Sequence, residues 1–245
     1  MRNIRLLIEY DGTHYHGWQV QPNAVTIQEI IEEKLATMTR ERIHLAASGR
    51  TDAGVHALGQ VANFRTSSSI PLEGFLRGLN SLLPPDIVIR SAEEVEPDFH
   101  AQFGAKRKTY RYVILNGPMP SAIHRHYAWH IPHSLDLQAM ERASHYLLGK
   151  QNFASFRAAD GDSSDPVREV FRAEWSAPAR PFLHFTIEAN GFLKHMVRNI
   201  VGTLVEIGKG RMGEEEFARI LTARDRRQAG MTAPAQGLFL VEVRY

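Results

Sequence analysis

The sequence predicts an α+β fold built from two βαββαβ halves. Two patterns support this prediction: apolar residues recur at strand and helix spacing in that order, and the order starts again after Lys106. The composition agrees with it, since 43% of the 245 residues are hydrophobic and 23% are charged, which excludes a disordered or fibrous chain. We therefore predict two domains, residues 1–104 and 105–245.

The first half begins with a strand over Ile4–Tyr10, which ends at the turn dipeptide Asp11-Gly12. The residues Thr26-Ile27-Gln28-Glu29 form a capping box, and the apolar residues that follow have helical spacing. The remaining predicted elements are strands over Ile43–Ser48 and Gln60–Arg65, a helix that begins at Pro71, and a strand over Asp86–Val95.

The second half repeats this order with insertions. Its predicted elements are a strand over Lys108–Leu115, a helix from about Asp136 to Leu148, strands over Arg168–Ser176 and Phe182–Ala189, helices over Phe192–Ile207 and Glu214–Ala223, and a strand over Leu238–Arg244. This pattern is ferredoxin-like and normally places helices on one face of an antiparallel sheet. Two such halves can share one extended antiparallel sheet, and we expect an active-site cleft at their junction.

Charge is divided unequally between the halves. Residues 1–103 carry 9 Lys and Arg against 13 Asp and Glu, whereas residues 104–245 carry 20 against 14. A basic C-terminal half favours a polyanionic partner, and a broad sheet face without helices is typical of RNA-binding proteins.

Several classes are excluded by residues that the sequence lacks. With no cysteine there are no disulfides, cysteine nucleophiles or thiolate metal sites. The first ten residues lack the continuous apolar run of a signal peptide, and no apolar run reaches membrane length. We expect a cytoplasmic protein with no membrane association.

The densest candidate site is the stretch Ser48–Ala57, which lies between two predicted strands. It contains Arg50 and Asp52 among glycines that permit positive φ and close approach of a ligand to the backbone. The functional interpretation is a rigidly held carboxylate beside an arginine. The alternative is an ordinary loop in which Asp52 makes an Asx turn.

Two further candidates carry positive charge. On the helix that contains Gly191–Gly202, Lys194 and Arg198 are four residues apart on one face, which predicts either a ligand-binding surface or a solvated basic face.

The other candidate is the stretch Lys106–Tyr112, which leads into the predicted strand Lys108–Leu115. Its alternation places Lys108, Tyr110 and Tyr112 on one face and Arg107 on the other. Aromatic side chains among cations are typical of RNA-binding surfaces, and a half-buried strand with core tyrosines is the alternative.

Three weaker motifs do not predict a cofactor or a metal. The GxGxxG match at Gly208–Gly213 follows a helix rather than a strand, which contradicts a dinucleotide site. The histidine pairs at 14 and 16 and at 124 and 126 lack a clustered third ligand, and no Walker A sequence is present. A metal-dependent hydrolase that uses these histidines is nevertheless one alternative, and a non-catalytic RNA-binding protein is another.

Four motifs occur in order along the chain: YDGT with GWQ at 10–19, GRTDAGVHA at 49–57, RKTYRY at 107–112 and HMVRNIVG at 195–202. With these motifs the chain closely resembles the TruA family of tRNA pseudouridine synthases, over essentially its whole length. The resemblance implies a cofactor-independent isomerase that converts uridine to pseudouridine at nucleotides 38 to 40 of the tRNA anticodon stem-loop, usually as a homodimer.

The resemblance also implies roles for single residues. Asp52 is expected to be the catalytic carboxylate, Arg198 its partner, Tyr110 the aromatic residue over the target uracil, and Arg50 a contact that helps to hold the flipped nucleotide. Phosphate contacts are expected from Lys106, Arg107, Lys108 and Lys194.

The chain departs from the family pattern at two places. Gln102 and Gly104 stand where arginine and often serine are expected, so that one positive charge is missing. Asp162 and Asp165 add acid to a loop that is commonly neutral or basic. Both departures are expected to affect RNA affinity and not the chemistry.

Overall fold

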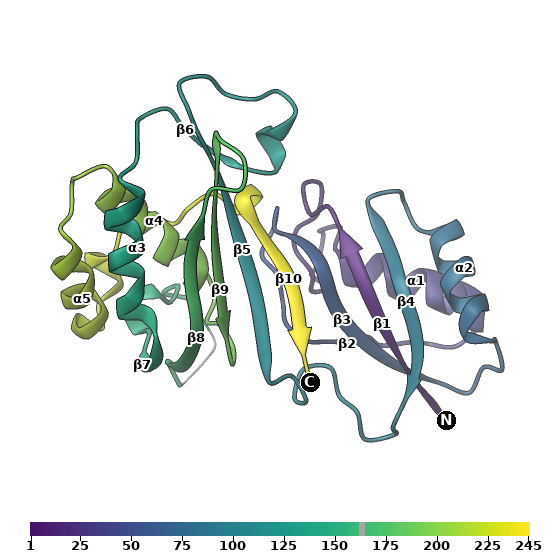
Figure 1. Cartoon of the computed structure of the whole chain (residues 1–245). Helices are drawn as coiled ribbons and strands as arrows, with labels where there is room; N and C mark the ends of the chain where they lie inside the picture. The colour runs from purple at the N-terminus through teal and green to yellow at the C-terminus, as the bar shows by residue number, and fades with distance from the viewer. Residues whose placement is uncertain (162–164) are drawn as a thin grey trace. The chain divides into compact units, whose positions relative to one another are not determined.

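The computed structural model describes residues 1–161 and 165–245, and Asp162 lies outside the described residues. The chain forms two compact units (Figure 1): unit 1 consists of Met1–Lys106 and Phe239–Tyr245, and unit 2 of Arg107–Leu238. Each unit combines strands and helices, which confirms the predicted α+β class. Within the described residues, no helix is long and apolar enough to cross a membrane.

Unit 1 has the predicted βαββαβ order and gains one more strand from the end of the chain. Its elements are β1 (Arg2–Tyr10), α1 (Ile27–Thr39), β2 (Ala46–Ala47), β3 (His56–Thr66), α2 (Leu72–Leu82), β4 (Ile87–Val95) and β10 (Leu238–Arg244). The strand order is β4-β1-β3-β10, and β2 pairs with another stretch of β3. All pairs are antiparallel except that of β3 with β10, which is parallel. The sheet is therefore mixed rather than purely antiparallel, because the last strand joins unit 1 and runs alongside β3.

Both helices of unit 1 cover the same face of its sheet. Along β1 the side chains alternate, and those of Ile4, Leu6, Ile8 and Tyr10 are buried. Phe64 of β3 packs edge-on against Phe75 of α2, with ring centroids 5.5 Å apart. Gly78 of α2 meets the Met38 side chain of α1, where an added Cβ would lie 2.4 Å from its Cε. The two helices thus pack on each other and on one sheet face, as the βαββαβ pattern predicts.

Within its described residues, unit 2 combines paired strands of its own with three α-helices. Its elements are β5 (Arg107–Asn116), β6 (Trp129–Ile131), α3 (Leu137–Ser144), β7 (Gly149–Asn152), β8 (Val167–Ser176), β9 (Phe182–Ala189), α4 (Met196–Gly208) and α5 (Glu214–Ala223). The strand order is β5-β9-β8-β7, and β6 pairs in parallel with β5. Trp175 of β8 packs on Phe185 and donates from Nε1 to Ser144 Oγ of α3 at 3.0 Å, which attaches that helix to the sheet. Both short strands, β6 and β7, lie outside the elements predicted from sequence.

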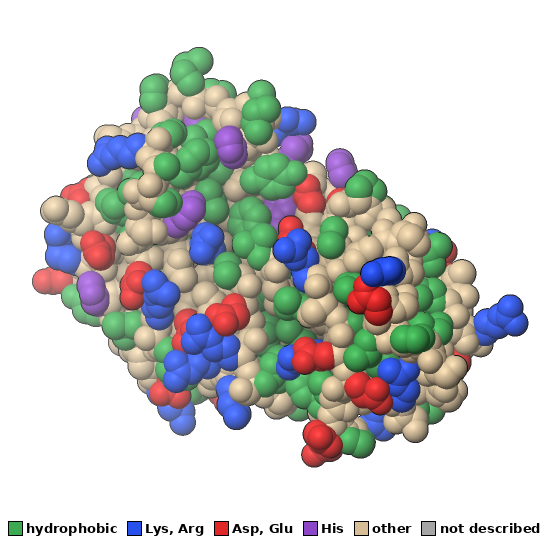
Figure 2. Space-filling view, turned by 45° about the vertical axis from the view of Figure 1, so that its right-hand side comes forward, with side chains coloured by type: hydrophobic (Ala, Val, Ile, Leu, Met, Phe, Trp, Pro, Cys, Tyr) green, Lys and Arg blue, Asp and Glu red, His purple; other side chains and the backbone are tan. Residues whose placement is uncertain are grey.

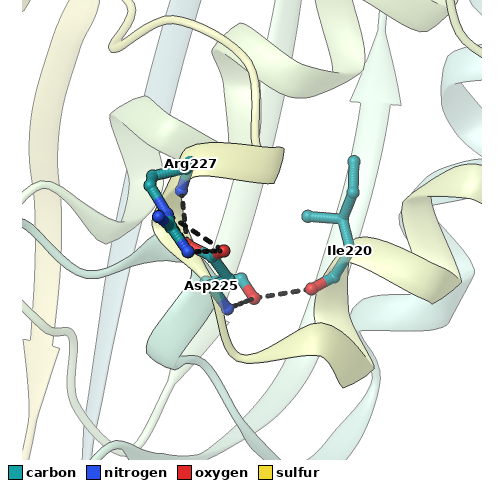
Figure 3. A network of polar contacts seen from close by, with 4 residues as sticks. Ile220, Asp225 and Arg227 are labelled. Atoms are coloured by element: carbon teal, nitrogen blue, oxygen red, sulfur yellow. Dashed lines mark hydrogen bonds and ion pairs between the residues drawn. The ribbon is translucent and has the colours of Figure 1, made fainter.

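A polar network fixes the chain where it leaves α5 (Figure 3). Ser155 Oγ donates to the carbonyl of Ile220 at 2.5 Å and accepts from the backbone N–H of Asp225 at 3.0 Å. The carboxylate of Asp225 in turn accepts two hydrogen bonds from Arg227 Nε and one from its Nη2. These contacts set the direction of the segment 226–237, which crosses α4.

Two helix starts differ from the predictions. The helix predicted from Phe192 begins at Met196, because His195 has a φ of 62° and this left-handed conformation cannot lie inside a helix. Thr26 is the residue that precedes α1, yet its side chain makes no capping hydrogen bond. The first N–H groups of α1 instead donate to the backbone carbonyls of Gly17 and Trp18. The capping-box pattern therefore predicted the correct start of α1, but Thr26 does not make the side-chain hydrogen bond that the pattern implies.

Candidate active site

Asp52 lies in the loop that connects β2 to β3 in unit 1. Several neighbouring side chains of this loop are buried in unit 1. Asp52 itself is half-buried, and Arg50 is exposed. The buried side chains of the loop are those of Ser48, Thr51, Val55 and His56. The loop therefore presents the carboxylate and the guanidinium from a backbone that is held on both sides of Asp52.

The motif around Tyr10 and Trp18 holds Thr51, the residue before Asp52. Tyr10 Oη and Thr51 Oγ1 are hydrogen-bonded at 2.7 Å, and the Thr51 carbonyl accepts from the Trp18 N–H at 3.1 Å. Burial raises the pKa of the Tyr10 phenol well above its usual value, so the phenol stays neutral. Gly17 has a φ of 89°, and a Cβ there would lie 2.6 Å from the Thr51 carbonyl oxygen. This packing gives a physical reason why the YDGT and GWQ motif accompanies the Asp52 loop.

Both ends of the loop are fixed by contacts with other segments of unit 1. Before Asp52, Ser48 Oγ and Gln60 Oε1 lie 2.7 Å apart, and Gln60 Nε2 donates to the Gly49 carbonyl at 2.9 Å. After it, His56 Nδ1 accepts from the Gly12 N–H at 3.0 Å. The His56 ring also stacks on Phe239 of β10, with centroids 4.7 Å apart. The last strand of the chain thus contributes to the frame of the loop.

Arg198 lies on the first turns of α4 in unit 2 and is half-buried. Its Nε donates to the Ala233 carbonyl at 2.8 Å, and the Ala233 N–H donates to the Arg198 carbonyl at 3.1 Å. This close approach needs Gly202, because a Cβ there would lie 1.7 Å from the Met231 carbonyl oxygen. The glycine that ends the HMVRNIVG motif therefore serves the contact that orients Arg198.

Tyr110 and Tyr112 of β5 have different surroundings. The ring of Tyr110 packs edge-on against Phe192, with centroids 5.0 Å apart, and 7% of the residue is exposed. Tyr112 is fully buried and donates from Oη to the Pro234 carbonyl at 2.7 Å. The alternative interpretation of this strand, core tyrosines, is correct for Tyr112.

Lys108 precedes these tyrosines on β5 and has an unusual charge environment. Burial and the nearby positive charge of Arg168 lower the pKa of the Lys108 ammonium to about 8. Arg168 is the second residue of β8 and lies 60 positions from Lys108 in the chain. Burial lowers the pKa of the Arg168 guanidinium as well. The sequence patterns did not single out Arg168, because only the tertiary structure brings it close to Lys108.

Two of the predicted phosphate contacts have carboxylate partners within the chain. Arg107 Nη1 lies 2.9 Å from Glu188 Oε1, and its guanidinium carbon lies 4.1 Å from the centroid of the Phe171 ring. Lys194 Nζ lies 2.6 Å from Asp160 Oδ2. On the face shown in Figure 2, many Lys and Arg side chains likewise lie next to Asp and Glu side chains. The positive charge of unit 2 is therefore partly compensated.

The predicted site residues belong to different units. Unit 1 holds Arg50 and Asp52 on one loop, and unit 2 holds Arg107, Lys108, Tyr110, Lys194 and Arg198. In residues 1–161 and 165–245, no group of three His, Asp or Glu side chains has an arrangement that could hold a metal ion.

Comparison with known proteins identifies the family. A family model described as tRNA pseudouridine synthase matches residues 6–104 and 143–245. The chain belongs to the tRNA pseudouridine synthase family. The resemblance drawn from the four sequence motifs is thereby confirmed, as is the predicted class of enzyme, an isomerase that acts on uridine in tRNA.

Similar tRNA pseudouridine synthases cover the whole chain. The protein named tRNA pseudouridine synthase A of Acetivibrio thermocellus is 49% identical over 245 residues, and that of Thermoanaerobacter sp. is 46% identical over 245 residues, each with full coverage of both chains. That of Geobacter sp. is 48% identical and matches 100% of this chain and 99% of its own. Among solved structures, a chain of a Cbf5-Nop10-Gar1 complex matches 96% of this chain and 57% of its own with a TM-score of 0.36 at 12% identity, which is too low to add to the argument.

Proposed function

We propose that this chain converts uridine to pseudouridine at nucleotides 38 to 40 of the tRNA anticodon stem-loop, with Asp52 as the catalytic carboxylate. The observation that carries the proposal is the frame around Asp52, in which Thr51, Val55 and His56 are buried while Asp52 keeps solvent access. A carboxylate that must meet a ribose carbon needs a fixed position and an open side. The Asp52 loop has both.

The reaction explains why a single carboxylate is central. The N1–C1′ glycosidic bond breaks, the uracil turns while it remains bound, and C5 forms a bond to C1′. C5 then loses its proton and N1 gains one, so that the product is an isomer of uridine. Asp52 can stabilise the sugar by attacking C1′ or can assist loss of a proton from C2′. Both routes require the anionic carboxylate, and both return it at the end of the cycle.

Arg198 is proposed as the partner of the Asp52 carboxylate. Its guanidinium is oriented by the Ala233 carbonyl, so that the side chain loses little conformational freedom when it meets an anion. A guanidinium close to a carboxylate favours the charged form that the reaction needs. Arg50, exposed on the same loop as Asp52, is proposed to hold the flipped nucleotide.

Tyr110 is proposed to contact the target uracil once the base has left the stem. Extrusion of a stacked base costs a few kcal/mol, which contacts in the pocket must offset. The ring of Tyr110 is held by Phe192, and its phenol can assist loss of the C5 proton directly or through water. Lys108, Arg107 and Lys194 are proposed to contact phosphates, which position the RNA without reading its bases.

We further propose that the enzyme is a cytoplasmic homodimer that needs no metal or redox cofactor. Isomerisation rearranges bonds within one nucleotide and transfers no electrons to another molecule. The reaction therefore balances with Asp52 and proton exchange alone.

The test of this function is to map pseudouridine in tRNAs from a strain that lacks the gene, and to incubate the purified protein with those tRNAs. The expected result is loss of pseudouridine at positions 38 to 40 in the strain and its restoration in vitro by the wild-type protein but not by Asp52→Asn. Unchanged modification at these positions would refute the proposed target site, and restoration by Asp52→Asn would refute the proposed catalyst.

A further inference from the structure

A turn in unit 1 presents an aromatic ring to solvent. Phe103 is 80% exposed, more than any other Phe, Tyr or Trp residue in the described part of the chain. Its ring lies against that of His100, with centroids 4.4 Å apart and an angle of 33° between the planes. Single exposed apolar residues are common, so the exposure alone does not indicate a ligand. The hydrogen bonds that hold the backbone beneath the two rings do indicate one.

The turn is clamped from below by two buried asparagines on neighbouring strands. Asn63 of β3 accepts at Oδ1 from the Ala101 N–H and donates from Nδ2 to Asn3 Oδ1, both at 2.9 Å. Asn3 of β1 donates to the Phe99 carbonyl at 2.9 Å, and Tyr245 Oη donates to the Ala101 carbonyl at 2.8 Å. Ala101 is fully buried. The backbone beneath Phe103 is therefore fixed by side chains that do not belong to the turn.

The His100 ring is also held in place. Its Nδ1 accepts from the backbone N–H groups of Gln102 at 3.1 Å and Phe103 at 3.4 Å, and the His100 carbonyl accepts from the Gly104 N–H at 2.9 Å. An imidazole that accepts at Nδ1 carries its proton on Nε2, on the side of the ring away from the two N–H groups that donate to Nδ1. The two rings thus form a preorganised surface rather than a mobile loop tip.

Positive charge follows directly after the turn. Lys106 is exposed, and its backbone N–H donates to the Arg244 carbonyl at 2.8 Å, which anchors the residue that carries the charge. Aromatic rings that stack on bases, next to cations that contact phosphates, are what proteins use to bind unpaired nucleotides.

We propose that His100 and Phe103 form a stacking platform for an unpaired base of the RNA substrate, with Lys106 near its phosphate. The proposal rests on the function proposed above, in which the substrate is tRNA. Asn63, which clamps the platform, lies seven residues along β3 from His56 at the Asp52 end, a distance of roughly 23 Å. The platform therefore binds a nucleotide other than the target uridine, and it contributes to affinity rather than to the chemical step.

The experiment measures tRNA affinity and steady-state kinetics for variants of Phe103. Phe103→Ala should weaken binding by about 5- to 100-fold, the range found when a base-stacking ring is removed, with the loss in Kd and KM rather than in kcat. Phe103→Tyr and Phe103→Trp should bind like the wild type, whereas Phe103→Leu should resemble alanine because it lacks a π face. Met119→Ala is the matched control, since Met119 is 75% exposed and belongs to no proposed site.

A gain of affinity gives an independent test. Gln102 is exposed beside Phe103, so Gln102→Arg should tighten binding and steepen the log–log salt dependence by about 0.7–0.9 for one added phosphate contact. Crosslinking with 4-thiouridine-substituted tRNA should attach RNA to the peptide that contains residues 100–103. Crosslinks that form elsewhere in the protein but not in this peptide would contradict the platform.

Other outcomes also overturn the inference. Wild-type affinity of Phe103→Ala would show that nothing stacks on the ring, and wild-type affinity of Phe103→Leu would show that only apolar contact matters. A change of molecular mass in sedimentation of Phe103→Ala would assign the ring to a protein contact. If the wild type forms no pseudouridine at all, the proposed function fails. If the wild type is active and Phe103→Ala binds normally, only the platform fails.

Discussion

Arg198 and Ala233 hold each other through two hydrogen bonds that run in opposite directions. The Arg198 Nε donates to the Ala233 carbonyl, and the Ala233 N–H donates to the Arg198 carbonyl. The segment is attached nearby as well, because the buried side chain of Asn199 accepts from both Thr232 Oγ1 and Arg226 Nη2. The direction of the guanidinium is therefore set by Ala233, 35 positions away in the chain.

The first prediction concerns the contact that makes this geometry possible. Gly202→Ala should lower the free energy of unfolding by about 1–3 kcal/mol and reduce activity, because the methyl group would overlap the Met231 carbonyl and move Ala233. Denaturant unfolding and kcat/KM measure the two effects. Gly213→Ala is the control, since a Cβ there meets nothing within 4 Å. Equal stability of both variants would show that the segment yields to the methyl group.

The role of Arg198 predicts a large difference between two arginines. Arg198→Leu should reduce kcat/KM by about 10²-fold or more, because the proposed partner of the reacting carboxylate is lost. Arg224→Leu should have little effect, since Arg224 is exposed where α5 ends. Turnover assays on tRNA would compare them, and equal losses in the two variants would remove Arg198 from the site.

Asp52→Asn should reduce turnover at least about 10³-fold while fold and tRNA binding persist, because the amide keeps the shape of the side chain and lacks the anionic oxygen. Binding by filter retention and pseudouridine formation by mass spectrometry would be measured on the same preparation. Turnover above trace level would contradict catalysis by Asp52.

Lys108 predicts a pH dependence of binding. Its pKa is lowered to about 8, so the ammonium is mostly charged at pH 7 and mostly neutral at pH 9. A phosphate contact made by Lys108 should therefore weaken as the pH rises through 8. Lys108→Arg should keep its affinity over this range, because a guanidinium stays charged, and Lys108→Gln should be weak throughout. Parallel pH profiles of Lys108→Arg and wild type would mean that Lys108 does not contact the RNA.

The ion pair between Lys194 and Asp160 predicts that one carboxylate opposes RNA binding. The pKa of Asp160 is lowered chiefly by its hydrogen bond to Lys194, so the carboxylate is anionic at neutral pH and competes with phosphate. Asp160→Asn should tighten tRNA binding, and Lys194→Gln should weaken it and lower the salt slope by about 0.7–0.9. A salt titration of each variant measures both effects. Unchanged affinity in both variants would place this pair away from the bound tRNA.

Elements with regular apolar spacing were predictable from sequence, and contacts between distant segments were not. The bounds of β9, α5 and β10 agree with the prediction, because alternation or helical spacing continues to both ends of each element. The predicted start of α4 was wrong because Leu193 fits the helical spacing of the apolar residues, although the helix begins only at Met196. The carboxylate partner of Arg107 is Glu188, 81 positions away, and no local pattern indicates it.

For the Asp52 loop too, the local pattern was predictable from sequence and the contacts with distant segments were not. Its glycines and its Arg50 and Asp52 side chains could be recognised in the sequence, whereas the hydrogen bond between Tyr10 and Thr51 that fixes it spans 41 positions. The expectation that β10 completes a second half-sheet also came from chain order alone. Its pairing with β3 is set by tertiary structure.

That pairing gives unit 1 a particular order of assembly during translation. The strands β1, β3 and β4 leave the ribosome first, but the stretch of β3 at His56–Ala57 must wait for β10 until all of unit 2 has been synthesised. An unpaired strand edge in a nascent chain can pair with other chains. The ring of Phe239, which stacks on His56, arrives at the same late moment. The Asp52 loop of a newly made molecule thus acquires its full support only after Phe239 has been synthesised.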